Sequence, residues 1–336
     1  MKEPIRVLNL FTIMNRGGAE TMVMNYYRNI DRTKVQFDFL VHRDEKGAYD
    51  DEILSLGGKI YHMIPIYPQN FLTYKKMLRE FFNEHKEYKI IHSHMSELGY
   101  FAFKEAKKQG IPIRICHAHS YPHQWDIKMI MRTYFKIRMM PYLTHMFTCG
   151  IEAGKWLYGK KNEKNFIQLN NAIDSKKFIY NKELEFLIRK ELKIENKLVV
   201  GHVGRFTEEK NHVRIVDIFE KIQEIKKDAI LILIGDGPLK IKIEQTVKKK
   251  KLENKVLFLG VRPDIDRLLQ SFDLFLFPSV FEGLPVSVIE AQAAGLQCFI
   301  SDVIPEQCII SDNVIRFSLL DDDKNIAHTI INMNKI

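Results

Sequence analysis

The sequence predicts an α/β protein built from two doubly wound domains, each with a parallel sheet between layers of helices. Its 336 residues exceed the length that one hydrophobic core usually serves. Short apolar segments of strand length alternate with helical patterns in both halves. A polar stretch over residues 170–196 interrupts this alternation, so we place the boundary there, with domains at residues 1–175 and 176–336.

Apolar segments in both halves have the length and composition of strands buried on both faces of a sheet. In the first half they are Ile5–Phe11, Phe37–Val41, Ile90–His92, Ile113–His117 and His145–Cys149. Helical patterns between them include Ala19–Asn29, Tyr74–Glu87 and Leu98–Gln109. The second half repeats the order with strands at Leu198–Val203, Ile230–Ile234, Val256–Leu259, Leu274–Pro278 and Cys298–Ser301. Its expected helices are Val213–Lys226, Leu239–Lys250, Ile265–Ser271 and Val286–Ala294.

Composition favours a water-soluble protein of the cytoplasm. The longest apolar runs, such as Ile230–Ile234, are too short to span a bilayer. The cysteines form no close pairs and no metal-ligand spacing, which is typical of reduced core residues; they are Cys116, Cys149, Cys298 and Cys308.

Net charge differs sharply between the two halves. Residues 1–180 hold 28 basic and 18 acidic side chains, a net charge of +10, whereas residues 181–336 hold 23 and 24, a net charge of −1. This asymmetry favours an anionic partner for the first half, either nucleic acid or a membrane surface. A basic face that only confers solubility is the alternative.

The segment from Ser279 to Gly295 carries two carboxylates eight residues apart, Glu282 and Glu290. Pro285 suits the first position of a helix and Gly295 the position just past its end. The residues between them are mostly small and apolar, so this helix should be buried. A bare carboxylate at Glu290 is then unfavourable, and it requires either a distant basic side chain or the hydroxyls of a ligand.

Two cations follow the strand that begins the second half, in the segment Gly204–His212. Lys210 lies close to the start of a predicted helix, where the helix dipole disfavours a cation unless an anion is also bound. Arg205 offers a planar fork suited to phosphate. The alternative is that both are solvated, with Lys210 paired to Glu208 or Glu209.

Other polar motifs also follow predicted strands, where ligands of open α/β sheets bind. Asn15–Glu20 contains Gly17 and Gly18, which would let the backbone approach a ligand closely. Two pairs of histidines, His92 with His94 and His117 with His119, lie at the ends of two later strands. A single buried histidine is most often structural. Ile234–Pro238 and Gly260–Asp264 follow strands of the second half, and for Ile234–Pro238 we expect a tight turn.

Two competing site types are disfavoured. A dinucleotide-dependent dehydrogenase needs Gly-x-Gly-x-x-Gly after its first strand, and neither Asn15–Gly18 nor Gly201–Arg205 has that spacing. A metal held by paired aspartates would need a motif such as Asp264-Ile-Asp266 or Asp321–Asp323. We interpret Asp264 as a helix cap and the later run as solvated.

Together these segments resemble the retaining, nucleotide-sugar-dependent glycosyltransferases of family 4. Glu282 and Glu290 match the Glu-x7-Glu motif of that family, and Gly204–Asn211 resembles its Gly-Arg-x4-Lys-Asn loop. Gly17-Gly18-Ala19-Glu20 is similar to its Gly-Gly-x-Glu loop. The resemblance implies the GT-B fold, in which two Rossmann-like domains face each other across a cleft. Such relatives usually continue past the equivalent of Ile336 with a helix that returns to the first domain, so we expect weaker packing between the domains here.

The resemblance also implies roles for individual residues. Arg205 and Lys210 would hold the donor diphosphate without a metal or other cofactor, and Glu282 would face the donor sugar. Glu290 would bind the nucleotide ribose. The remaining expected contacts are Gly283 and Leu284 beside Glu282, Gly17 and Gly18 facing the donor, Arg262 in the loop that lines the base, and His119 near the reaction centre.

The implied activity is transfer of a hexose-type sugar, with retained configuration, from a nucleotide-diphosphate sugar, expected to be UDP-linked. The acceptor would be a lipid-linked precursor of a capsular polysaccharide or exopolysaccharide, bound by the first half, with no nucleic acid involved. A nucleotide-sugar epimerase and a non-catalytic nucleotide-sugar-binding or membrane-adaptor protein are the alternatives.

Trp125–Leu143 predicts a helix with a basic stripe and a broad apolar surface. The stripe consists of Lys128, Arg132 and Lys136; the apolar surface of Ile127, Ile130, Met131, Tyr134 and Phe135. Such a helix can lie in a membrane interface or pack on a core with its charges outward. The family favours the membrane, with the enzyme peripheral on the inner face of the plasma membrane.

Overall fold

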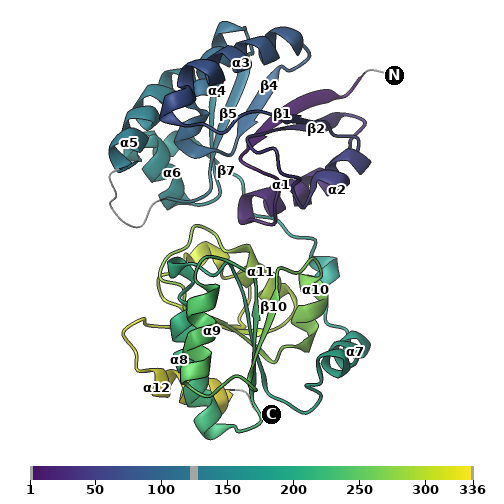
Figure 1. Ribbon diagram of the computed structural model, residues 1–336, viewed down its shortest axis with the longest axis vertical. Helices are drawn as coiled ribbons and strands as arrows, with labels where there is room; N and C mark the ends of the chain where they lie inside the picture. The colour runs from purple at the N-terminus through teal and green to yellow at the C-terminus, as the bar shows by residue number, and fades with distance from the viewer. Residues whose placement is uncertain (1–2, 122–127, 334–336) are drawn as a thin grey trace. The chain divides into compact units, whose positions relative to one another are not determined.

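The computed structural model describes residues 3–121 and 128–333, and the chain forms two compact units, Met1–Ala172 and Ile173–Ile336 (Figure 1). Each unit contains one parallel sheet with its own hydrophobic core. None of the helices within the described residues has the length and apolar composition needed to cross a bilayer.

Within its described residues, the first unit has a seven-stranded sheet in the order β3-β2-β1-β4-β5-β6-β7. The strands are β1 Ile5–Phe11, β2 Val35–Val41, β3 Ile60–His62, β4 Ile90–Ser93, β5 Ile113–Ala118, β6 His145–Thr148 and β7 Phe166–Gln168. The helices are α1 Gly18–Asn29, α2 Asp50–Ser55, α3 Phe71–Glu84, α4 Tyr100–Lys108, α5 Lys128–Met139 and α6 Ile151–Tyr158.

Helices cover both faces of this sheet because both faces are apolar. On one face α1 and α2 pack over side chains such as Phe39 (Figure 1). On the other face α3, α4 and α5 pack over Leu8 and Leu10 of the same central strands. Successive residues of a strand point to opposite faces, so a run without alternation fills two cores at once.

The second unit has a six-stranded parallel sheet in the order β10-β9-β8-β11-β12-β13. Its strands are β8 Val199–Val203, β9 Ile230–Ile234, β10 Val256–Gly260, β11 Leu274–Phe277, β12 Gln297–Ser301 and β13 Val314–Phe317. Its helices are α7 Lys182–Leu192, α8 His212–Ile225, α9 Lys240–Lys249, α10 Ile265–Leu268, α11 Val286–Ala293 and α12 Asp323–Met333.

The predicted strands are present, with ends within two residues of the expected positions, and three short outer strands, β3, β7 and β13, were not predicted. A helix, α7, also occupies part of the polar stretch. Asn181 caps it by accepting a hydrogen bond from the Leu184 amide at 3.0 Å. Arg189 then anchors α7 to the sheet through Asp273, 2.7 Å away, whose other carboxylate oxygen accepts from the Val199 amide at 2.6 Å.

Two histidines are buried in the core of the second unit. His212, at the start of α8, stacks on Phe206 with ring centroids 4.0 Å apart, and His202 in β8 lies edge-on to it at 4.8 Å. Burial lowers the pKa of His212 to about 3 and that of His202 well below its usual value, with nearby Lys210 adding to both shifts. Neither ring nitrogen of His212 has a hydrogen-bond partner among the described residues.

Replacing His212 with Phe should make the folded state less sensitive to acid. The unfolded chain takes up a proton at this histidine near pH 6.5 and the folded chain only near pH 3. Stability conferred by the neutral ring is therefore complete above pH 6.5 and is lost as pH falls toward 3, by up to ~1.4 kcal/mol per pH unit. Urea denaturation followed by circular dichroism at pH 7, 6 and 5 measures the slope.

The matched control is His62→Phe at an exposed position of β3, which should keep the wild-type pH dependence. Equal slopes for the wild type and His212→Phe would show that this ring does not contribute to the acid sensitivity.

Candidate functional site

The carboxyl ends of β8 and β11 meet at one edge of the second sheet, because the two strands pair directly in parallel. The segments that follow them, residues 204–211 and 278–285, are joined by two hydrogen bonds. The Val280 amide donates to the Glu209 carbonyl at 2.9 Å, and the Asn211 side chain donates to the Pro278 carbonyl at 3.2 Å. The loops that carry the predicted cations and the first glutamate therefore lie side by side.

An ion pair between Lys210 and Glu282 links these loops. Lys210 Nζ lies 2.6 Å from Glu282 Oε1, and the two side chains are only 17% and 12% exposed. The ammonium also lies 4.8 Å from the centre of the Phe277 ring. The alternative pairing of Lys210 with Glu208 or Glu209 is not formed. Two predicted site residues, 72 positions apart, are in direct contact instead.

Arg205 lies in the same loop and is exposed, with no hydrogen bond or ion pair to its guanidinium among the described residues. The Phe206 amide next to it is held by the Asp236 carbonyl at 3.0 Å. Arg205 therefore presents an unpaired planar fork in the same loop as Lys210, and such a fork can bind phosphate oxygens.

Two glycines set the position of the Arg205 loop. Gly235 has φ +136°, and a Cβ on it would lie 2.1 Å from the Gly204 carbonyl oxygen. A Cβ on Gly237 would lie 2.6 Å from the Phe206 carbonyl oxygen. We predicted a tight turn at 234–238. The contact between the two backbones was not foreseen, because spacing along one loop gives no information about the loop it touches.

Glu290 projects from the second turn of α11. Pro285 occupies the N-cap position, one residue earlier than predicted, and Gly295 follows the helix with φ +78°, as predicted. The Glu290 carboxyl has no hydrogen bond or ion pair within the described part of the chain. Burial raises the pKa of this carboxyl to about 7, with the Asp266 carboxylate adding to the shift. The distant basic partner that we considered is absent there.

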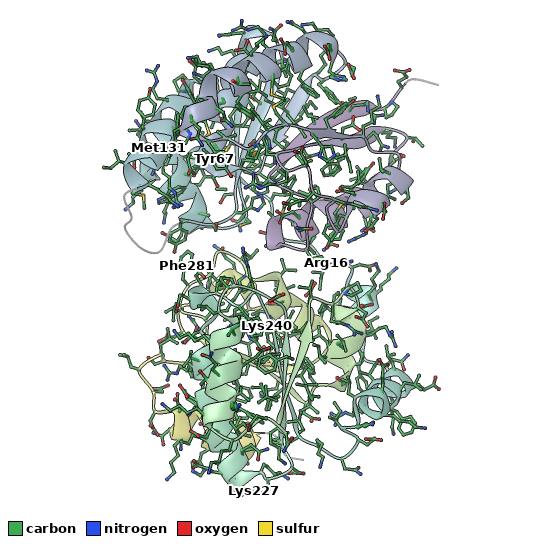
Figure 2. The ribbon with its side chains drawn as sticks, viewed as in Figure 1. Arg16, Tyr67, Met131, Lys227, Lys240 and Phe281 are labelled. Atoms are coloured by element: carbon green, nitrogen blue, oxygen red, sulfur yellow. The ribbon has the colours of Figure 1, made fainter. Side chains whose placement is uncertain are left out.

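Gly283 and Leu284 lie in the loop between the two glutamates, with Phe281 at the same end of the unit (Figure 2). Leu284 is buried. Arg262, in contrast, is already occupied: its Nε and Nη2 each donate to Asp264 at 2.8 Å. It would have to leave Asp264 to bind a ligand through these donors.

The two aspartate motifs differ in part from our interpretation. Asp264 occupies the N-cap position of α10, but its side chain binds Arg262 and does not cap the helix. Asp323 accepts from Arg214 Nε at 3.0 Å, and Arg214 also donates to the carbonyls of Leu319 and Asp321. Asp323 is therefore an anchor between α8 and α12, whereas Asp321 and Asp322 are exposed, as expected for a solvated run.

In the first unit, Gly17 is the N-cap of α1 and Gly18 its first residue. The Glu20 carboxylate folds back onto Gly17, where an added Cβ would lie 2.3 Å from Oε2, whereas nothing lies within 4 Å of a Cβ on Gly18. Burial raises the pKa of Glu20 to about 7. Arg16 stacks on Tyr49 at 5.3 Å. Gly17 thus borders a second carboxyl whose pKa is raised by burial.

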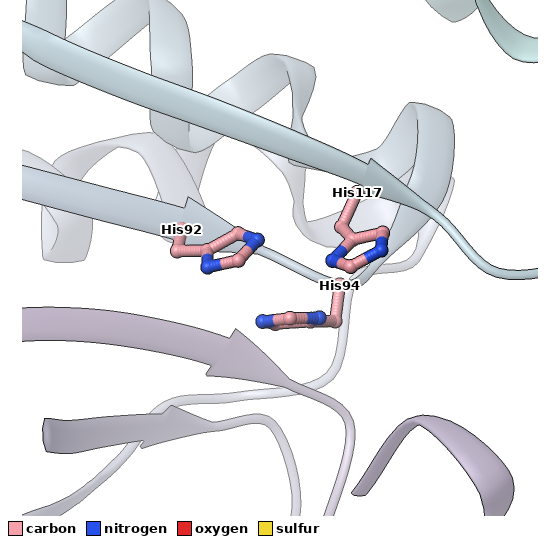
Figure 3. A group of neighbouring side chains, drawn as sticks. All are labelled: His92, His94 and His117. Carbon is pink, nitrogen blue, oxygen red and sulfur yellow. The ribbon is translucent and has the colours of Figure 1, made fainter. Parts of the chain in front are cut away.

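Four histidines gather where β4 and β5 end, and three of them are drawn in Figure 3. His94 Nδ1 lies 2.8 Å from His119 Nε2, and the ring centroids of His117 and His119 are 4.2 Å apart. Burial is the main cause that lowers all four pKa values, that of His92 to about 3 and that of His119 to about 4. The rings are therefore neutral near pH 7.

Ring nitrogens of His92, His94 and His117 lie within 4.8 Å of one another. Bonds of ~2.0 Å to a tetrahedral zinc would require separations of ~3.3 Å. Both nitrogens of His94 are moreover used, Nδ1 with His119 and Nε2 with Asn9 Oδ1 at 3.4 Å. The three rings lie close to one another, but only His94 is hydrogen-bonded: His92 Nε2 and both ring nitrogens of His117 have no hydrogen-bond partner among the described residues.

Of the three basic side chains in the stripe predicted for Trp125–Leu143, Lys128 is exposed, whereas Arg132 and Lys136 contact neighbouring side chains of the first unit. Arg132 lies 3.7 Å from Glu97, Lys136 covers the Trp156 ring at 4.5 Å, and burial lowers the pKa of Lys136. Phe135 is buried as well. Trp125 and Ile127 lie outside the described residues.

The outward face of α5 is apolar instead. Ile130, Tyr134 and Ile137 are 70%, 55% and 65% exposed, and we call these three residues the α5 apolar face. Their spacing of four and three residues is the sequence signal that identifies one side of a helix. The predicted surface included Ile130 and Tyr134 but omitted Ile137.

Known proteins resemble this chain in both halves. Residues 16–149 match glycosyltransferase family 4, and residues 184–333 match the group 1 glycosyl transferases. EpsF of Bacillus subtilis, described as a glycosyltransferase, is 38% identical over 90% of this chain and 80% of its own length. CapH of Staphylococcus aureus, a capsular polysaccharide biosynthesis glycosyltransferase, is 27% identical over 85% of this chain and 78% of its own.

A UDP-Gal:alpha-D-GlcNAc-diphosphoundecaprenol alpha-1,3-galactosyltransferase of Escherichia coli is 25% identical over 69% of this chain and 62% of its own length. Among solved structures, HepE of Anabaena in complex with UDP and glucose has a TM-score of 0.82, with 17% identity, over 98% of this chain and 90% of that one. The predicted GT-B fold class of two Rossmann-like domains is thereby confirmed. On the strength of both family matches and the extended identity to EpsF, the chain belongs to glycosyltransferase family 4.

Proposed function

We propose that the protein transfers a hexose-type sugar, with retained configuration and without a metal, from a UDP-sugar to a lipid-linked polysaccharide precursor. The second unit would bind the donor and the first the acceptor. The observation that carries the proposal is the contact of Lys210 with Glu282 beside the unpaired Arg205. Cations for a diphosphate and a carboxylate for sugar hydroxyls are thus together at one sheet edge.

Donor binding would rearrange this ion pair. A diphosphate attracts both Arg205 and Lys210, and hydrogen bonds between charged groups are the strongest available. Lys210 would shift toward the phosphate oxygens, and Glu282 would then accept hydrogen bonds from the sugar. HepE, with its bound UDP and glucose, and the UDP-Gal-dependent enzyme of Escherichia coli support uridine as the base.

The same cations would promote the chemical step. As the bond between the anomeric carbon and the phosphate oxygen breaks, negative charge grows on the leaving diphosphate. Arg205 and Lys210 would stabilise this charge in place of a metal. The leaving phosphate oxygen would take the proton of the acceptor hydroxyl on the same face of the sugar, and the configuration would be retained.

The acceptor side of the proposal rests on the α5 apolar face and on the net charge of +10 in residues 1–180. Apolar side chains at a helix surface can enter the boundary of a bilayer, and surrounding cations attract anionic lipid headgroups. The relative from Escherichia coli uses an acceptor on diphosphoundecaprenol. A peripheral position on the inner face of the plasma membrane would bring this chain to a similar substrate.

Incubation with a panel of radiolabelled nucleotide sugars and bacterial membrane lipid extract tests the proposal. We expect label from one UDP-sugar to move into the organic-extractable fraction, equally well with and without EDTA. Conversion of the donor into another nucleotide sugar without transfer would indicate an epimerase. Loss of transfer in EDTA would contradict the metal-free mechanism.

Glu282→Ala and Lys210→Met should each reduce kcat by a factor of ~10²–10³, because each removes a group that acts on the reacting end of the donor. Steady-state transfer at saturating donor measures the effect. Lys227→Met is the control: Lys227 is exposed and lies at the opposite end of the unit from Phe281 (Figure 2). Wild-type turnover in both site variants would refute the assignment.

Glu290→Gln should raise the donor KM by a factor of ~10 or more while kcat changes little, since a hydrogen bond to a charged group is worth ~1.5–3 kcal/mol. Ionised Glu290 is the better acceptor for ribose hydroxyls. With a pKa of about 7, it loses this form as pH falls, so wild-type donor affinity should weaken below pH 7. Calorimetric titration with UDP between pH 6 and 8 should show a steeper dependence in the wild type than in Glu290→Gln, in which only the UDP phosphate titrates.

Ile130→Ser combined with Ile137→Ser should weaken sedimentation with phosphatidylglycerol vesicles by a factor of ~100, because each side chain loses apolar burial worth ~1.5–3 kcal/mol. The control is Ile241→Ser, an equally exposed isoleucine of α9 in the other unit. Unchanged sedimentation of the double variant would show that the α5 apolar face does not contact the lipid.

A further inference from the structure

We propose that Asn9 and His94 are positioning residues that hold His119 in one tautomer, with its proton on Nε2 and a bare Nδ1 available to accept a hydrogen bond. The hydrogen-bonded chain Asn9–His94–His119 carries this assignment. The nature of the ligand at Nδ1, a sugar hydroxyl, rests on the proposed function.

The chain starts at Asn9, which is fully buried in the central strand β1. Asn9 Nδ2 lies 3.4 Å from the Val7 carbonyl oxygen and 3.4 Å from the Asp38 carbonyl oxygen. Carbonyl oxygens only accept, so the amide nitrogen must face them. This fixes the orientation of the Asn9 amide. Its oxygen, which can only accept a hydrogen bond, then faces His94.

His94 is the second member. Its Nε2 lies 3.4 Å from Asn9 Oδ1, so Nε2 must carry the proton that makes this contact a hydrogen bond. Burial keeps the pKa of His94 well below its usual value, and the neutral ring has a single N–H. His94 Nδ1 is therefore a lone pair. The ring is also held flat on Phe11, with centroids 4.3 Å apart and planes 8° from parallel.

His119 is the third member. Its Nε2 lies 2.8 Å from His94 Nδ1, and because that nitrogen has no proton, His119 Nε2–H must donate. His119 is neutral near pH 7, since burial lowers its pKa to about 4. Its Nδ1 is thus unprotonated, and this nitrogen has no hydrogen-bond partner among the described residues. The ring is only partly buried, unlike that of His117.

The proposed consequence is that His119 distinguishes hydrogen-bond donors from acceptors on the ligand. Nδ1 of His119 would accept a hydrogen bond from a hydroxyl of the ligand and would repel a group that only accepts. Asn9 acts on this preference through His94, without touching the ligand. A sugar hydroxyl meets this requirement, because it can donate.

Long-range ¹H–¹⁵N correlation spectra of protein labelled with ¹⁵N-histidine at pH 7 test the assignment directly. His119, identified by the signal missing in His119→Asn, should show a protonated, pyrrole-like Nε2 and an unprotonated, pyridine-like Nδ1. A proton on Nδ1 of His119 in the wild type would overturn the proposal, and the only variant that this result requires is His119→Asn, for the assignment.

A pair of variants tests the chain itself. His94→Phe keeps an aromatic ring against Phe11 and removes both hydrogen bonds, so His119 should become a mixture of tautomers and kcat/KM should fall ~3–10-fold. His92→Phe is the control, since the His92 ring lies 4.2 Å from that of His94 but outside the hydrogen-bonded chain. It should leave the His119 tautomer as in the wild type.

An unchanged His119 spectrum in His94→Phe would also overturn the proposal. Protein that shows the assigned tautomer but transfers no sugar from any donor would contradict the proposed function and leave this assignment intact. The two claims can therefore fail separately.

Discussion

The ion pair between Lys210 and Glu282 is the central interaction at the edge of the second sheet where the carboxyl ends of its strands lie. Two charges with little access to water are stable only when they are paired, and removal of either leaves the other uncompensated. The pair joins two loops that follow neighbouring strands, so it forms only when these two loops lie next to each other. A ligand that separates these charges has to replace the interaction that each of them loses. A diphosphate joined to a polyhydroxylated sugar offers both replacements in one molecule.

The surrounding backbone keeps this edge in place. Gly235 and Gly237 approach the Arg205 loop so closely that a side chain at either position would collide with its carbonyl groups. Behind the loop, Phe206 and His212 stack in the core, and neither nitrogen of His212 has a partner within the described residues. Such an arrangement tolerates no charge on the ring. The charged residues of the site thus rest on a layer that is apolar or neutral, which keeps the electrostatic interactions at the edge strong.

The fold was largely predictable from sequence because strands buried on both faces leave an unbroken apolar signal, as Ile230–Ile234 does. Short outer strands such as β3 lack that signal, since three half-exposed residues resemble a loop. In the candidate site, the resemblance of two loops to family motifs singled out Lys210 and Glu282 but could not show that they touch, because their contact depends on strand order. The orientation of Lys136 toward Trp156 was likewise invisible, since a periodicity gives the faces of a helix without telling which one points inward.

The outward side of α5 bears on which substitutions the protein can accept during evolution. Ile130, Tyr134 and Ile137 project from the helix away from the buried side marked by Phe135, so the packed interior places little constraint on them. Polar replacements there would cost the folded state almost nothing. If these positions remain apolar during evolution, the constraint must come from a partner that the helix contacts outside the molecule.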